Sequence, residues 1–248
     1  MFLYILNMSE KLSIEVCISP AIFDKYVNKE SNVVVIDVFR ATSSVCTGFK
    51  NGLKELIPIA DKEDARKMKE QGFLVAAERN GIKLDFADFG NSPYNFSKEN
   101  VEGKTIVYST TNGTKAIQKA SECNKVVLAS FLNLSAVCEY LISEKRNIIV
   151  LCAGWKTKLS LEDTVLAGAI TEKILESNLY YTKCDTATTA LDLWSLAKVD
   201  LVQYMQKAAQ RDRLRQFGLD DVIEYCLQID TMRIIPYYDN GKIFKMDY

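Results

Sequence analysis

Short apolar runs alternate with stretches of helical periodicity along the first two thirds of the chain. The clearest run, 31–39, is rich in β-branched residues and predicts a buried strand, and a helix over 43–50 follows it. By the same criteria we expect further strands at 56–60, 73–78, 104–109, 125–130 and 147–154. Further helices are expected at 64–71, 115–120, 134–145 and 163–177. This alternation indicates an α/β fold in which crossover helices join parallel strands.

The pattern becomes mainly helical after Cys184. We expect helices over 186–197, from Asp200 to Phe217, and from Asp220 onwards. The segment 233–246 predicts a hairpin, because Asp-Asn-Gly lies between two alternating apolar runs. With no internal repeat and no linker, we expect a single domain over 1–248. The expected architecture is a three-layer α/β/α sandwich with a largely parallel or mixed central sheet and a helical C-terminal region.

The composition is that of an ordinary globular protein, with 248 residues, 48% hydrophobic and 25% charged. A net charge of −1 gives no general attraction to nucleic acid or to an anionic membrane, so we expect neither as a partner. No run of about 18 apolar residues predicts a membrane span. The seven cysteines are odd in number and scattered, which predicts reduced core residues in a cytoplasmic protein. The apolar patch in 1–6 lacks a basic flank, so we expect no signal peptide.

The chain contains no histidine. Ser-His-Asp hydrolases, Cys-His proteases, histidine phosphatases and histidine-ligated metal enzymes are therefore excluded. Catalysis would have to use carboxylates, hydroxyls, amides, arginines or lysines. A bound metal would be held by oxygen atoms, which favours Mg²⁺ or Mn²⁺ over zinc.

Ligands of open α/β sheets bind at the carboxyl ends of the strands, and four polar clusters of this chain fall at such positions. The first is DVFRATSS, in which Asp37 ends an apolar strand and Arg40 follows. A buried carboxylate there needs a metal or a hydrogen-bond donor. The alternative is that Asp37 pairs with Arg40 while Ser43 caps the helix. The D-x-D motif of haloacid-dehalogenase phosphatases is broken, because Phe39 occupies its second acidic position.

The second cluster contains Glu78 and Arg79 at a strand end, followed by a Gly-Asn-Ser-Pro turn that presents Asn91 and Ser92. A surface ion pair and ordinary turn chemistry are the alternative interpretation. The third cluster is TTNGT at 110–114, between a strand and a helix, where backbone N–H groups can form a nest for an anion. It lacks the spacing of a Walker A loop, and an N-capped turn explains it equally well.

The fourth cluster places Glu162 and Asp163 at the start of a helix. Two adjacent acids there can hold a cation beside an anion-binding loop. The alternative is a capping box between Ser160 and Asp163.

The four blocks DVFRATSS, ER-x-G…DFGNSP, TTNGT and CAG…SLEDTVLAGA occur in an order and at spacings that resemble the 2-phosphosulfolactate phosphatase (ComB) family. The similarity extends from about Val33 to Ala169. It implies a cytoplasmic, Mg²⁺-dependent acid phosphatase that converts (R)-2-phospho-3-sulfolactate to 3-sulfolactate and phosphate, the step known from coenzyme M biosynthesis. The implied partner is a small anionic phosphorylated substrate, and a homodimer is one possible assembly.

The resemblance supplies positions, and residue type suggests the roles. We expect Asp37, Arg40 and Glu78 to be catalytic and Asp37, Glu78, Glu162 and Asp163 to lie at the metal. The expected substrate-binding residues are Arg79, Asn91, Ser92, Thr110, Thr111, Asn112, Gly113 and Thr114. Family members often carry a histidine before the segment at Phe217, where this chain reads AAQRDRLRQ. Either that histidine is dispensable or the substrate differs.

Two other functions remain open at this point. A phosphatase for another small phosphorylated hydroxy acid would keep the metal and phosphate groups, whereas a non-catalytic anion-binding protein would need only the TTNGT loop. The attacking group is also open, because Asp37 and a metal-activated water both fit the sequence.

Overall fold

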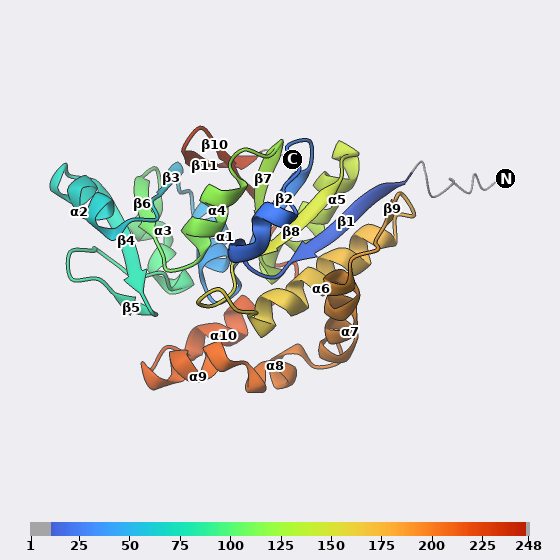
Figure 1. Ribbon diagram of the computed structural model, residues 1–248. Coiled ribbons are helices and arrows are strands. Elements are labelled where there is room, and N and C mark those ends of the chain that lie inside the picture. Colours follow the sequence, from blue (N-terminus) through green and yellow to red (C-terminus); the bar gives the residue numbers. More distant parts are fainter. Residues whose placement is uncertain (1–10, 247–248) are drawn as a thin grey trace.

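The computed structural model describes residues 11–246, which form one mixed sheet with helices around it (Figure 1). The apolar segment at 1–6, considered above as a signal peptide, lies outside the described residues. The strands are β1 (Leu12–Cys17), β2 (Asn32–Ile36), β3 (Glu55–Pro58), β4 (Leu74–Arg79), β5 (Ile82–Lys83), β6 (Thr105–Ser109), β7 (Lys125–Ala129), β8 (Ile148–Cys152), β9 (Tyr180–Tyr181), β10 (Ile235–Asp239) and β11 (Lys242–Met246).

The α-helices are α1 (Ala41–Lys50), α2 (Lys62–Glu70), α3 (Lys98–Val101), α4 (Gly113–Ala120), α5 (Leu134–Glu144), α6 (Leu161–Leu175), α7 (Asp185–Ala197), α8 (Leu201–Tyr204), α9 (Ala209–Gln216) and α10 (Asp221–Cys226). Short 3-10 helices are η1 (Pro20–Lys25), η2 (Pro93–Phe96), η3 (Phe131–Asn133) and η4 (Met205–Lys207). None of the helices within 11–246 is long and apolar enough to cross a bilayer.

The sheet consists of two groups of parallel strands joined by the C-terminal hairpin. Its order is β5-β4-β6-β3-β11-β10-β7-β2-β8-β1-β9. β7, β2, β8, β1 and β9 pair in parallel, as do β4, β6 and β3. Between the groups, β7–β10, β10–β11 and β11–β3 all pair antiparallel. Three successive reversals therefore set the direction of β3, β4 and β6 against that of β7 and β2.

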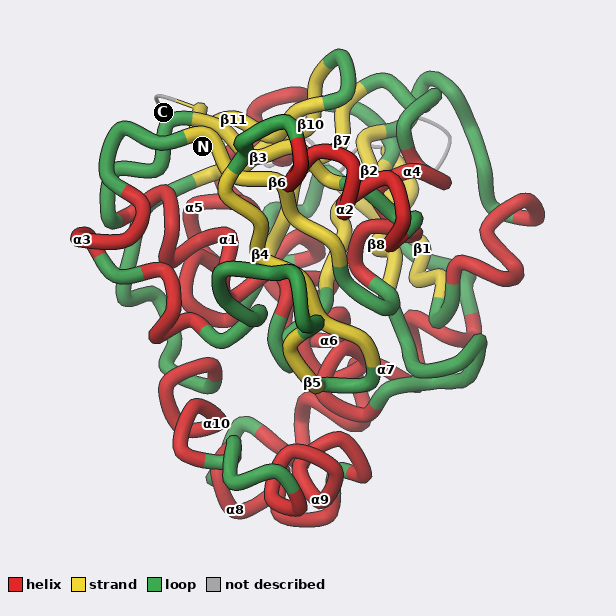
Figure 2. The backbone as a smooth tube through the Cα atoms, turned by 90° about the vertical axis from the view of Figure 1, so that its left-hand side faces the viewer, coloured by secondary structure: helices red, strands yellow, loops and turns green. Residues whose placement is uncertain are grey.

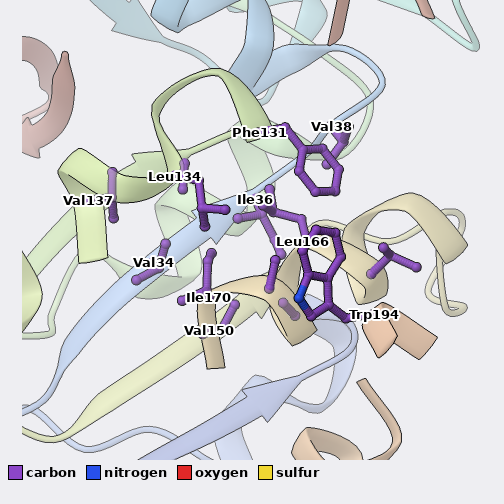
Figure 3. Packing of buried hydrophobic residues seen from close by; sticks show 14 of the residues in the cluster. Val34, Ile36, Val38, Phe131, Leu134, Val137, Val150, Leu166, Ile170 and Trp194 are labelled. Carbon is purple, nitrogen blue, oxygen red and sulfur yellow. The ribbon is translucent and has the colours of Figure 1, made fainter. Parts of the chain in front are cut away.

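Helices cover both faces of the sheet. Val34, Ile36 and Val150 pack against residues of α5 and α6, as Figure 3 shows. The alternate residues of β2, Val33 and Val35, belong to a second cluster together with Ala116 and Ile117 of α4. Val45 and Phe49 of α1 and Val101 of α3 belong to this second cluster as well. The predicted α/β/α arrangement with a mixed sheet is confirmed, because strand residues alternate between the two faces.

The helical C-terminal region is also confirmed, but the predicted helix from Asp200 to Phe217 is interrupted. Asp200 caps α8 through the N–H of Gln203, as expected. The chain then passes through η4 and becomes extended at Ala208 before α9 begins. Met205 and Ala208 are both fully buried in the core, so tertiary packing overrides the helical propensity of the segment. Figures 1 and 2 both show α8, α9 and α10 grouped at the bottom of the molecule.

Three strands were not predicted from the sequence. β5 and β9 have two residues each, too few for a periodic signal. β1 does show alternating burial, with Ile14 and Val16 buried. It pairs in parallel with β8 and lies next to the edge strand β9. The hairpin at 233–246 is present, with β10 and β11 in register over five residue pairs.

Candidate active site

Two acids, an arginine and two amides from the predicted site line one small cavity, which we call the acid cavity. Its volume is about 20 Å³, which leaves room for roughly one water molecule. The cavity is lined by Asp37, Phe39, Arg40, Glu78, Gly81, Asn91, Asn112, Trp155 and Gln210. Glu78 lies at the end of β4, Asn91 lies in the loop before η2 and Gln210 lies on α9, while the others follow β2, β4, β6 or β8. The carboxyl ends of both parallel groups therefore converge here, although the groups are separated by three antiparallel pairings.

Asp37 lies directly after β2 and is held by the start of α1. The N–H of Ala41 is 3.4 Å from its Oδ1. Gly113, at the start of α4, lies so close that a Cβ there would be 3.0 Å from Oδ2 of Asp37 and 2.9 Å from Cβ of Ala41. The pKa of Asp37 is raised to about 7, mainly by burial and in smaller part by the negative charges of Glu78 and Glu162. Ala41 and Gly113 oppose the rise through their N–H groups.

Arg40 is 3% exposed, and within residues 11–246 its side chain forms one hydrogen bond, from NH2 to the carbonyl oxygen of Gly81 at 3.3 Å. Within the described residues it forms no ion pair with Asp37, so the first alternative interpretation of this cluster is wrong. Ser43 does not cap α1 either, because its hydroxyl donates to the carbonyl of Val38. The other guanidinium N–H groups of Arg40 can therefore donate hydrogen bonds to a ligand in the acid cavity.

Glu78 is 4% exposed at the end of β4, and backbone groups hold both of its carboxylate oxygens. Oε2 accepts the N–H of Gly81 at 2.6 Å, and Oε1 accepts the N–H of Thr111 at 2.7 Å. The Thr111 hydroxyl donates to Oε1 as well, at 3.0 Å. These contacts fix Glu78 between the β4–β5 turn and the loop before α4.

The TTNGT loop therefore holds protein carboxylates, and only part of it reaches the cavities. Asn112 lines the acid cavity, whereas Thr110 and Thr114 bond to each other at the start of α4. Those two hydroxyls are used within the protein, so the structure does not bring them to the site. The predicted nest of N–H groups donates instead to Glu78, through Thr111, and opposes the raised pKa of Asp37, through Gly113.

Arg79 points away from the acid cavity. Its guanidinium donates to the carbonyl oxygens of Glu78, Ser109 and Ala60 and to the Ser109 hydroxyl, at 2.6 to 3.2 Å. With these acceptors in place, Arg79 ties together the ends of β3, β4 and β6. The structure gives it a supporting position and not the predicted contact with substrate.

Asn91 lines the acid cavity, and Ser92 does not. Asn91 is 6% exposed, and its Oδ1 is buried without a hydrogen-bond partner. Buried polar atoms are rarely left unpaired, so the amide needs a partner that an occupant of the cavity can supply. Ser92 lies on the wall of a neighbouring pocket of about 330 Å³, which we call the outer pocket. Arg40, Gly81 and Asn91 belong to both walls.

Glu162 and Asp163, at the start of α6, are buried and do not line the acid cavity. Asp163 accepts the N–H of Val38 at 2.9 Å through Oδ1 and the N–H of Gly154 at 3.1 Å through Oδ2. It therefore joins the ends of β2 and β8, and the capping box with Ser160 is absent. Burial raises the pKa of Asp163 well above its usual value, with Glu162 and Asp37 adding to the rise. Burial also raises the pKa of Glu162, while Arg213 lowers it.

Trp155 and Gln210 line the acid cavity and Arg213 contacts both of them; none of the three was predicted. The guanidinium of Arg213 stacks 4.2 Å from the Trp155 ring centroid, and its Nε donates to Oε1 of Gln210 at 2.7 Å. Gln210 in turn donates to the carbonyl of Phe39 at 3.4 Å. We call these three residues the roof. Gln210 and Arg213 belong to the AAQRDRLRQ segment, where the departure from the family pattern was the only signal that pointed to them.

The residues around the acid cavity fit Mg²⁺. No three acidic, cysteine or histidine side chains in the described part of the chain gather as a metal cage. Mg²⁺ commonly takes one or two carboxylates and completes its coordination with water and substrate phosphate. Asp37 and Glu78 both line the acid cavity and are such a pair. Burial is the main cause of the raised pKa of Asp37 and the negative charge of Glu78 adds to it, so a cation there would favour the charged form of Asp37. The unpartnered oxygen of Asn91 is a further ligand of the right type.

Comparison with known proteins agrees with these features. The model of the 2-phosphosulpholactate phosphatase family matches residues 17–241. A probable 2-phosphosulfolactate phosphatase from Caldanaerobacter subterraneus subsp. tengcongensis is 38% identical over 86% of this chain and 90% of its own length. Proteins with the same description from Thermotoga maritima and Clostridium botulinum are 39% and 31% identical, over 84% and 95% of this chain and 89% and 100% of their own lengths. The chain belongs to the 2-phosphosulfolactate phosphatase (ComB) family.

Proposed function

We propose that this protein is a Mg²⁺-dependent phosphatase that hydrolyses (R)-2-phospho-3-sulfolactate to 3-sulfolactate and phosphate. The observation that carries the proposal is that Asp37, Arg40 and Glu78 line one buried cavity at the convergence of the strand ends. The names of the relatives support the substrate, and the composition of the cavity supports phosphate ester chemistry without histidine.

Arg40 binds the phosphoryl group in this proposal. Its guanidinium has one bond to protein, so its other N–H groups can donate to non-bridging phosphate oxygens. Because the side chain is 3% exposed, little water competes for these bonds. The Asn91 amide can supply a further contact from the opposite loop, since its oxygen has no partner in the protein.

Asp37 and Glu78 would hold Mg²⁺. The ion, when bound, neutralises charge on the phosphate oxygens and on the two carboxylates. Glu78 is kept in position by Thr111 and Gly81, and Asp37 by Ala41, so both acids are oriented before substrate arrives.

Asp37 has two chemical roles available in the hydrolysis. As a carboxylate it can attack phosphorus, which forms an aspartyl phosphate and expels the alkoxide. The alkoxide takes a proton from water, and the hydroxide so formed cleaves the aspartyl phosphate to free Asp37 and phosphate. In the metal-free protein the pKa of about 7 allows Asp37 to be a carboxylic acid near neutral pH. In that form Glu78 would hold the ion, while Asp37 donates its proton to the leaving alkoxide and water attacks phosphorus. Trapping with hydroxylamine separates the two routes, because only the first forms an acyl phosphate.

The test is phosphate release from racemic 2-phosphosulfolactate with Mg²⁺ or with EDTA. We expect Mg²⁺-dependent release that stops when half of the racemate is consumed and that exceeds release from 2-phospholactate and phosphoglycolate. Phosphate release from the two comparison esters alone would contradict the proposed substrate but would still support a phosphatase activity. A folded protein that releases phosphate from none of the three would overturn the proposed function in favour of an anion-binding protein.

A further inference from the structure

A second pocket adjoins the acid cavity and carries two lysines. Its volume is about 150 Å³, and its wall includes Thr111, Asn112, Lys115, Lys156 and Thr157. We call it the lysine pocket. Asn112 belongs to the walls of both the acid cavity and the lysine pocket. The two cavities therefore adjoin at Asn112.

The charge of the lysine pocket is uncompensated. Lys115 and Lys156 are both exposed, and neither forms an ion pair with an acid anywhere in residues 11–246. The one recorded contact of the Lys156 ammonium is with the Trp155 ring, at 5.6 Å from the centroid. The wall contains no acidic residue. Two ammonium groups in a neutral wall attract an anion more strongly than isolated surface lysines do.

Asn112, which both cavities share, is the N-cap residue of the helix that carries Lys115. Its side chain makes no bond to the N–H groups of α4, and the N–H of Gly113, the first residue of α4, already stabilises the charged form of Asp37. The Asn112 amide can therefore contact a ligand that spans the two cavities.

The outer pocket is the other space beside the acid cavity, and its charge suits an anion less well. Its lysine, Lys83, already donates to the carbonyl of Ala87 at 3.0 Å. Its wall also contains the carboxylate of Asp88, which bonds to Lys69 and to the N–H of Val75. A second negative group would meet a carboxylate there instead of two unpaired ammonium groups.

We propose that the lysine pocket binds the second strong acid of the substrate, its sulfonate, and that Lys115 and Lys156 determine specificity for it. The proposal rests on the function proposed above, since it assumes that the phosphoryl group occupies the acid cavity. The phosphate then meets Arg40 on one side of Asn112, and the sulfonate meets the two lysines on the other. A phosphorylated hydroxy acid without the sulfonate leaves the lysine pocket empty.

The test compares Lys115→Ala, Lys156→Ala and the double variant with two matched controls. Lys119→Ala removes a lysine one turn further along α4, and Lys158→Ala removes one from the same loop as Lys156; neither side chain lines the pocket. We expect the double variant to lose at least tenfold in kcat/KM on 2-phosphosulfolactate, mainly through KM, and less than twofold on 2-phospholactate. The controls should stay within twofold on both esters.

Equal losses on both esters, or no loss on either, would overturn the proposal. A titration of 3-sulfolactate followed by calorimetry separates this proposal from the proposed function, because it needs no turnover. If the wild-type protein hydrolyses neither ester yet binds 3-sulfolactate at least tenfold more tightly than the double variant, the lysine pocket stands and the phosphatase fails. If the wild-type protein does not bind 3-sulfolactate, the lysine pocket fails.

Discussion

The carboxylate of Asp163 accepts the backbone N–H of Val38 at 2.9 Å, across 125 positions of sequence. Its second oxygen accepts the N–H of Gly154, so this one buried side chain links the segments that follow β2 and β8. Val38 precedes Arg40 by two residues, and Gly154 precedes Trp155. Asp163 therefore positions two sides of the acid cavity without lining it.

Replacing Asp163 with Ala should destabilise the protein even in EDTA. Both N–H groups would be buried without an acceptor, at about 1–3 kcal/mol each. We expect the Tm of the metal-free variant to fall by at least about 5 °C, with a smaller fall for Asp163→Asn, which keeps one acceptor. Asp192→Ala, at an exposed position of α7, is the control. An unchanged Tm in EDTA would show that Asp163 acts on the metal alone.

Asp37 should destabilise the folded protein at alkaline pH. Its pKa is raised in the folded protein to about 7, so its favourable contribution is complete below the unfolded value and is lost as the pH rises through about 7. In EDTA, Asp37→Asn should therefore raise the Tm at pH 8 by roughly 2–8 °C and change it little at pH 4. Thermal unfolding at both pH values checks this, and a larger gain at pH 4 than at pH 8 would contradict the sign.

The cysteines should react slowly in the native protein. Burial raises the pKa of Cys17 to about 11 and that of Cys46 and Cys226 to about 12. At pH 8 a thiol with a pKa of 12 is ionised to about one part in ten thousand. We expect Ellman's reagent to modify the partly exposed Cys184 first and all seven thiols only after denaturation. If several thiols of the native protein react as fast as Cys184, the prediction is wrong.

The roof should move when a ligand enters, because the acid cavity holds roughly one water molecule. Trp155 stacks on Arg213, whereas Trp194 lies in the core and donates to Glu172. Titration with phosphate and Mg²⁺ should change the tryptophan fluorescence of the wild-type protein and of Trp194→Phe. The change should disappear in Trp155→Phe. A change that follows Trp194 instead would place the motion elsewhere.

The sequence predicted most strands, the hairpin and the fold class because these depend on local periodicity. It did not predict where the hairpin goes. Insertion of β10 and β11 between β7 and β3 depends on pairings such as Tyr237 with Val127, which are distant in sequence. The predicted site residues follow strands that were expected to be mostly parallel, whereas the acid cavity lies where two opposed groups of strands converge. The cumulative twist of sheets makes such convergence geometrically available.

For the site, residue type and strand position selected Asp37, Arg40, Glu78 and Asn91, all of which line the acid cavity. The same criteria also selected Arg79, which has its bonds within the protein. The sequence does not distinguish an arginine that faces a ligand from one such as Arg79, because it does not show which side-chain N–H groups already donate to backbone carbonyl oxygens. The roof was missed for a related reason: Gln210 meets Phe39 only through tertiary packing across 171 positions.

The most direct test of the central claim is phosphate release from 2-phosphosulfolactate by the wild-type protein, Asp37→Asn and Asp85→Asn, each with saturating Mg²⁺. Asp85 is exposed and paired with Arg66, so its variant controls for the loss of one acidic group. We predict activity in the wild-type protein and in Asp85→Asn, and a loss of at least a thousandfold in Asp37→Asn with its fold retained. Wild-type activity that persists in Asp37→Asn would contradict the assignment of the chemistry to the acid cavity.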